Sequence, residues 1–313
     1  MKTAFNIAFL AVLVLVNVAP ASATPATRCE VVNLMPEFWR FWDSSQGMKQ
    51  EERVARFKAE IVAKHPELYS KDVLAGMDLA KFDHYVAQGF DTVAKYEPKM
   101  RKLSAQIQDD LPKYQKDFKR LFPDYKCSST PIYFYFPVGA FDGGTRPVNG
   151  KTTLLFGLDT IARTREPQDM KAFFGHELFH IYHSDLLGEQ PETLYWDLWE
   201  EGLATYVSHV FSPKSSESGI LGTPIDLAQR TRPLLPKIVP QLIANLGSTD
   251  EKIVQKPFLY NQSADLPPRY GYYVGYRVVQ RVAQKHSLQA MTRLKGEELE
   301  NEIRSALESL DPR

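Results

Sequence analysis

The feature of this sequence that most constrains the rest of the chain is the pattern H-E-x-x-H at residues 176–180. If this stretch is helical, His176 and His180 lie one turn apart on the same face, with about 6 Å between their Cβ atoms. Both imidazoles can then bind one small cation, and zinc fits because it takes imidazole nitrogen at about 2.0 to 2.1 Å. Glu177 lies beside the first histidine, where it can accept a proton from a zinc-bound water without binding the ion. The pattern alone leaves open a buried helix whose histidines are satisfied by hydrogen bonds.

A catalytic zinc ion needs a third protein ligand. His183 is on the same face but lies about 10 Å along the helix axis from His176, which is too far to share a tetrahedral ion. The longer metzincin pattern, with Gly and then His beyond the second histidine, is missing. A carboxylate on the next predicted helix, which begins near Thr193, fits better. Glu200 and Glu201 are 100° apart on that helix, so only one of them can point at the metal.

These residues resemble the gluzincin metallopeptidases, in which H-E-x-x-H on one helix is completed by Glu on the following helix. Their second motif often reads Glu-Gly-x-Ala, and residues 201–204 match it, starting 21 positions after His180. More narrowly, the order of these motifs and of Gly-Tyr-Tyr-Val-Gly-Tyr at residues 271–276 resembles a bacterial family of predicted zinc-dependent proteases. The resemblance covers residues 131–290. It implies that Glu201 is the third ligand, and the three ligands together predict one zinc ion per chain.

Residues around Glu201 could support this ligand. The small Gly202 permits close approach of the two motif-bearing helices. Thr205 and Asp197 lie one turn after and one turn before Glu201, so each could hold the ligand from a second layer of contacts. Both could equally be ordinary polar surface residues.

The resemblance also implies an oxyanion-stabilising residue, because gluzincins use a Tyr or His from a later segment for this purpose. Tyr272 and Tyr276 share a helix face close to a helix N-terminus, which suits them to that role. Tyr273 stays a third candidate. Clustered tyrosines are also common packing residues, so the sequence leaves both interpretations open.

The first 23 residues are predicted to be a secretion signal. Lys2 supplies the positive start, residues 8–18 are apolar apart from Asn17, and Ala21-Ser22-Ala23 forms an A-x-A cleavage site. The apolar run is too short to span a bilayer, so we expect cleavage after Ala23 and no stable membrane anchor. The expected location is therefore periplasmic or secreted.

The two cysteines, Cys29 and Cys127, both follow the predicted cleavage site. An exported chain enters a compartment that permits disulfides, so we predict that the two residues are bonded. The alternative is two free, buried thiols.

Charge and composition restrict the partners. The chain has 38 basic and 38 acidic residues, and this balance gives no indication of nucleic acid or anionic lipid as a partner. The expected partner is a peptide or protein substrate, and the sequence leaves the oligomeric state open. A hydrophobic content of 43% suffices for a sizeable core.

The predicted fold class is α+β, mainly helical. Three parts are expected: the signal (1–23), an N-terminal helical region (24–126) and a zinc metallopeptidase-like catalytic region (127–313). In the helical region, apolar residues recur at steps of three and four. Pro98 suits a helix start, and Pro112 either bends the helix or restarts it.

Two stretches in the catalytic region have strand character. Residues 131–137 and 152–157 are aromatic and branched, and a turn-rich segment separates them. We expect them to form a hairpin with a long loop, giving a small antiparallel sheet beside the H-E-x-x-H helix, as in a gluzincin catalytic domain. The resemblance further implies that the strand ending at Gly157 is the edge along which an extended peptide lies.

The sequence thus predicts an exported zinc metallopeptidase in which Glu177 is the general base for a metal-activated water. One alternative is a zinc-dependent hydrolase of another amide, such as a cell-wall peptide. The other alternative is a non-catalytic peptide-binding protein that retains the helix pair.

Overall fold

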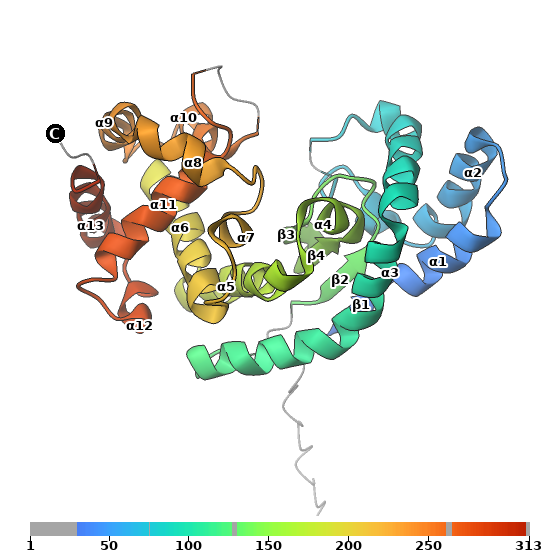
Figure 1. Ribbon diagram of the computed structural model, residues 1–313, viewed down its shortest axis with the longest axis horizontal. Coiled ribbons are helices and arrows are strands. Elements are labelled where there is room, and N and C mark those ends of the chain that lie inside the picture. The colour runs from blue at the N-terminus through green and yellow to red at the C-terminus, as the bar shows by residue number, and fades with distance from the viewer. Residues whose placement is uncertain (1–29, 75, 127–129, 261–264, 311–313) are drawn as a thin grey trace, which may run out of the picture.

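The computed structural model of this chain describes residues 30–74, 76–126, 130–260 and 265–310 (Figure 1). The predicted signal and both cysteines lie outside these ranges. Cleavage after Ala23 and the Cys29 to Cys127 disulfide therefore stay predictions.

The described chain is mainly helical with one small sheet, so the predicted fold class is confirmed. Figure 1 shows the sheet in the middle of the molecule, with the first two helices on one side, the helices that follow residue 193 on the other, and the long helix of residues 82–121 extending past both. The N-terminal part contains β1 (Val31–Asn33), α1 (Met35–Ser44), α2 (Gln50–Phe57) and α3 (Phe82–Leu121). The middle part contains β2 (Ile132–Tyr135), β3 (Gly143–Val148), β4 (Lys151–Gly157) and α4 (Leu158–Thr164).

Two long helices follow, and then a set of shorter ones. The long pair is α5 (Met170–Leu187) and α6 (Leu194–Phe211). The shorter helices are α7 (Glu217–Leu221), α8 (Leu227–Thr231), α9 (Leu235–Asn245), α10 (Glu251–Gln255), α11 (Tyr270–Val282), α12 (Leu288–Met291) and α13 (Gly296–Glu308). None of the helices in the described ranges is long and apolar enough to cross a membrane.

Helix α3 is one continuous helix with Pro98 and Pro112 inside it, so the prediction that Pro98 begins a helix is wrong. A proline in a helix interior costs about 3 kcal/mol, whereas burial of one large apolar side chain contributes about 1.5 to 3 kcal/mol. The apolar stripe of α3 continues past both prolines and is buried, at Met100, Leu111 and Phe118 among others. Burial of the stripe therefore outweighs the cost of the prolines, which bend helices. Figure 1 shows α3 clearly bent along its length.

The sheet is mixed, with the strand order β1-β2-β4-β3. Strands β2 and β4 are parallel, with Ile132 opposite Leu154, so the predicted hairpin of these two strands and the purely antiparallel sheet are wrong. The connection between them contains β3, which pairs antiparallel with β4. Asn149 and Gly150 join β3 to β4 with φ values of 49° and 74°, as a two-residue type I′ hairpin turn requires.

The N-terminal and catalytic regions share this sheet. Strand β1, which the sequence analysis did not predict, pairs in parallel with β2. Helix α3 packs against α4 and α5. The division at residue 126 stays a prediction from sequence, but in space the two regions form one core.

Helices α6 and α11 cross at two glycines. A Cβ atom added at Gly202 would overlap the backbone of Gly275, and one added at Gly275 would overlap the carbonyl oxygen of Leu198. Gly202 therefore permits close approach of α6 to α11. The prediction that Gly202 brings the H-E-x-x-H helix close to the helix of Glu201 is wrong. The crossing brings the first turn of α11 close to α6.

We expect Gly275→Ala to lower the free energy of unfolding by at least about 1 to 3 kcal/mol, because the added methyl group meets backbone atoms that cannot rotate away. Urea denaturation of the purified protein measures this change. Gly247→Ala is the matched control, because a Cβ atom there meets nothing within 4 Å. Equal denaturation midpoints for the two variants would contradict the close crossing.

Candidate metal centre

The centre lies between α5 and α6, two helices that pack against each other and are joined by residues 188–193. Gly188 ends α5 with a φ of 68°, and the Thr193 side chain caps α6 by accepting a hydrogen bond from the Trp196 amide. Both helices bury most of their side chains. The polar side chains of the two sequence motifs therefore meet in a largely apolar environment.

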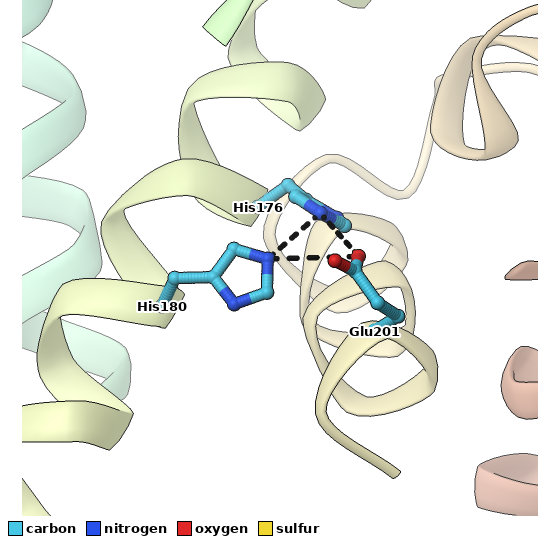
Figure 2. A group of neighbouring side chains, drawn as sticks. All are labelled: His176, His180 and Glu201. Atoms are coloured by element: carbon cyan, nitrogen blue, oxygen red, sulfur yellow. Dashed lines mark hydrogen bonds and ion pairs between the residues drawn. The ribbon is translucent and has the colours of Figure 1, made fainter. Parts of the chain in front are cut away.

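His176, His180 and Glu201 converge on one point (Figure 2). The Nε2 atoms of the two histidines are 3.0 Å apart. Glu201 Oε2 lies 3.2 Å from His176 Nε2 and 3.6 Å from His180 Nε2. Tetrahedral zinc ligands with bonds of 2.0 to 2.1 Å are about 3.3 Å from one another, so these three atoms can surround one zinc ion. Within the described ranges, no other group of three His, Cys, Asp or Glu side chains meets this condition.

The electrostatics of the three side chains favour a bound cation. Burial raises the pKa of Glu201, but the neighbouring His180 and His176 outweigh this and hold it well below the usual range. Burial lowers the pKa of His180, yet Glu201 and Glu200 raise it well above its usual value. Glu201 Oε2 is also buried without a hydrogen bond from the described residues. The site therefore attracts a positive charge, which either a proton or a metal ion can supply.

Glu177 is buried beside this group but does not join it. Its side chain is 8% exposed, and it lies against the first residue of β3, where a Cβ atom at Gly143 would be 3.1 Å from Glu177 Oε1. Burial raises the pKa of Glu177, and the nearby His176 and His180 offset part of this effect. A carboxylate with a raised pKa beside a metal site is well suited to accept and return a proton.

Glu200 lies on the far side of His180, with its Oε1 atom 3.8 Å from His180 Nδ1. Such a contact from a carboxylate can orient a ligating imidazole. The two supports suggested by sequence make other contacts: the Thr205 hydroxyl donates to the Glu201 backbone carbonyl, and Asp197 accepts a hydrogen bond from Gln255. Neither side chain contacts the Glu201 carboxylate.

His183 is a packing residue in this structure. Its ring stacks on Trp196 at a centroid distance of 5.4 Å and on Phe179 at 5.0 Å. These contacts agree with the exclusion of His183 as a ligand by its distance along the helix.

Of the three candidate tyrosines, the structure brings only Tyr272 to the centre. Its ring centroid is 6.5 Å from that of His176, and it lines the same cleft. Tyr276 is one turn further along α11, where its hydroxyl is 2.7 Å from His209 Nδ1 and accepts a hydrogen bond from Gln280. The prediction that Tyr276 lies at the oxyanion position beside the centre is therefore wrong. The Tyr273 hydroxyl accepts hydrogen bonds from Arg232 and Arg277.

A cleft of about 410 Å³ opens beside the three candidate ligands. The strand along it is β3, through Gly143, Gly144 and Thr145. Strand β4 lies between β2 and β3, so the expectation that the strand ending at Gly157 forms the edge is wrong. The free edge that faces the cleft belongs to β3.

Four further charged residues line the cleft and are not predicted from the sequence as site residues: Asp142, Arg165, Asp185 and Arg269. They come from segments that are far apart in the chain, and no spacing pattern links them. The only local sequence signal among them is the turn-rich stretch that starts at Asp142, which by itself predicts no more than a connection.

A helix pair that presents two histidines, a glutamate and an adjacent carboxylate outside that group is an arrangement found in zinc-dependent hydrolases. The chain belongs to the family described as "Putative zinc dependent peptidase (DUF5700)", whose model matches residues 40–297. The matched range includes most of the N-terminal helical region as well as the site. Comparison with curated proteins and with solved structures gave no match.

Proposed function

We propose that this protein is an exported zinc metallopeptidase of the gluzincin type. In this proposal His176, His180 and Glu201 hold one zinc ion, and Glu177 is the general base. The observation that carries the proposal is the convergence of three ligand atoms with a buried carboxylate beside them that does not take part in the group. A protein that only binds peptides has no use for such a carboxylate next to its metal ligands.

A zinc ion at this site would lower the pKa of a water molecule at its open position and polarise the carbonyl of the scissile bond. Glu177 takes the proton from the attacking water and later gives it to the leaving amine. Its raised pKa suits both transfers, because the carboxylate can hold the proton between them.

In this proposal Tyr272, which lines the cleft near His176, donates a hydrogen bond to the carbonyl oxygen as negative charge develops there. Burial raises the pKa of Tyr272, so its hydroxyl keeps its proton at neutral pH. Arg269 lies over the Tyr272 ring, with its Cζ atom 4.0 Å from the ring centroid.

The free edge of β3 is suited to hold an extended peptide. The Gly157 amide donates to the Asp142 carbonyl, so the alternation of antiparallel pairing makes Thr145 and Leu154 a pair without mutual hydrogen bonds. The N–H and C=O groups of Thr145 therefore point away from β4, toward the edge. Pro147 lies at the next such position, where a missing N–H costs no bond to β4. A peptide can add to this edge as a further strand.

Incubation of the purified protein with a mixture of synthetic peptides, followed by mass spectrometry, tests the function. We expect cleavage that stops when a chelator removes the metal and returns when zinc is added. Cleavage of cell-wall peptides with no cleavage of ordinary peptides would favour the amide-hydrolase alternative. Binding of peptides without any cleavage would favour the binding protein.

The proposal of export rests on the predicted signal at residues 1–23. N-terminal sequencing of protein taken from the periplasm or medium should give a chain that begins at Thr24. Protein that keeps Met1 and stays in the cytoplasm would contradict export.

A further inference from the structure

Two buried arginines lie at one end of the cleft. Arg165 follows α4 and Arg269 precedes α11, yet both approach the turn at Gly222 and Thr223. A Cβ atom at Gly222 would be 3.0 Å from Arg165 Nη1, and Arg269 Nη1 donates to the Thr223 carbonyl at 2.7 Å. Arg269 is 9% exposed and the Arg165 side chain 10%. Both also line the cleft beside Tyr272.

Only one of the two guanidinium groups has a carboxylate partner. Arg165 Nη2 is 2.9 Å from Asp142 Oδ2, and Asp142 also lines the cleft. Arg269 forms no ion pair with any carboxylate of the described residues, and its contacts there are neutral. They are the Thr223 carbonyl, the Tyr260 hydroxyl at 3.2 Å and the rings of Tyr260 and Tyr272.

This end of the cleft therefore carries one net positive charge. We call it the arginine end and define it by Asp142, Arg165 and Arg269. Burial raises the pKa of Asp142, but Arg165 and then Arg269 outweigh burial and lower it, so the single carboxylate stays ionised between two cations. An uncompensated guanidinium that is nine-tenths buried is costly unless an anion completes its contacts.

Apart from the three proposed zinc ligands and the arginine end, the charged residues that line the cleft are acidic: Glu177, Asp185 and Glu200. These carboxylates repel a negatively charged group on a ligand, whereas the arginine end attracts it. A guanidinium fork held in place by neutral contacts is well suited to a carboxylate, which it can bind through two parallel hydrogen bonds.

We propose that the arginine end binds a carboxylate of the peptide substrate, with Arg269 as the residue that determines this specificity. This inference rests on the proposed peptidase function and narrows its substrate class to peptides with a carboxylate on the side of Tyr272. The carboxylate has two sources, the C-terminus of a short peptide or an Asp or Glu side chain within a longer one.

Peptide affinity measured on the full-length, zinc-loaded Glu177→Gln protein tests this inference without turnover. Three versions of one peptide distinguish the sources: a free C-terminus, an amidated C-terminus, and an amidated C-terminus with an internal Glu. We expect at least one version with a carboxylate to bind about tenfold or more tightly than the neutral version. Equal affinity for all three versions would overturn the inference.

Two further substitutions in this background change the charge in opposite directions. Arg269→Gln should abolish the preference for a carboxylate, and Asp142→Asn should increase it. A purely structural role of Arg269 predicts instead that Arg269→Gln weakens all three peptides equally, which would overturn the inference. If Arg269→Gln does not fold, Asp142→Asn still tests whether the net charge of the arginine end sets the preference for a carboxylate. An unchanged or smaller preference in Asp142→Asn would then overturn the inference.

A failure of this inference can be distinguished from a failure of the proposed peptidase function. Wild-type protein that cleaves all peptides without regard to a carboxylate retains the proposed function and overturns the inference. Protein that neither binds nor cleaves any peptide overturns both.

Discussion

Replacing Glu177 by Gln is expected to leave zinc in place and to reduce peptide hydrolysis at least about a hundredfold. The amide fills the same space beside Gly143, where Glu177 Oε1 and an added Cβ would be only 3.1 Å apart, but it cannot accept a proton from water. Because Glu177 is not part of the group formed by His176, His180 and Glu201, the substitution leaves the three proposed metal ligands unchanged. Measurement of kcat/KM together with zinc content per chain checks both parts of the result.

The matched control is Glu192→Gln, the same chemical change at an exposed position in the link between α5 and α6. It should keep both the zinc content and the rate. A zinc-replete Glu177→Gln protein that cleaves peptides at the wild-type rate would show that Glu177 is not the base.

The neighbouring glutamates of α6 should differ strongly when each is changed to Gln. Glu201→Gln is expected to lower zinc affinity by more than about a hundredfold, because it removes a charged ligand, and peptidase activity should fall with it. Glu200→Gln should lower the zinc affinity by only about tenfold, because a residue that supports a ligand contributes about 10- to 100-fold and the contact of Glu200 with the far side of His180 is long, at 3.8 Å. Competition with a chromogenic chelator measures both affinities.

Each of these two variants is the control for the other, because they carry the same substitution at adjacent positions. A larger loss of zinc affinity in Glu200→Gln would assign the third ligand to Glu200. Equal, small losses would mean that neither glutamate binds the ion.

The core of the site could be predicted from sequence because it depends on local geometry. A helix fixes the distance between His176 and His180, and the 100° between Glu200 and Glu201 allows only one of the two glutamates to point at an ion held by both histidines. The structure places Glu201 there, as the motif resemblance implied. Tyr276 shows the limit of this approach, since a shared helix face says nothing about which turn reaches the cleft.

The remaining features depend on contacts between distant segments. Gly202 signals a close approach, but only the structure shows that its neighbour is Gly275 on α11. The Asn149-Gly150 turn is a strong local hairpin signal, but Pro147 weakens the strand signal of the residues before it. Arg165 and Arg269 meet only when α4, α7 and α11 are assembled around the cleft, so no spacing rule could bring them together.

X-ray absorption at the zinc edge of the purified, full-length protein tests the central claim most directly, because it reports the atoms bound to the ion. Our account predicts one zinc ion per chain with two imidazole nitrogens and oxygen ligands at about 2.0 to 2.2 Å. A shell with sulfur at about 2.3 Å, a shell with fewer than two imidazoles, or protein that retains no zinc when purified without chelator would contradict it.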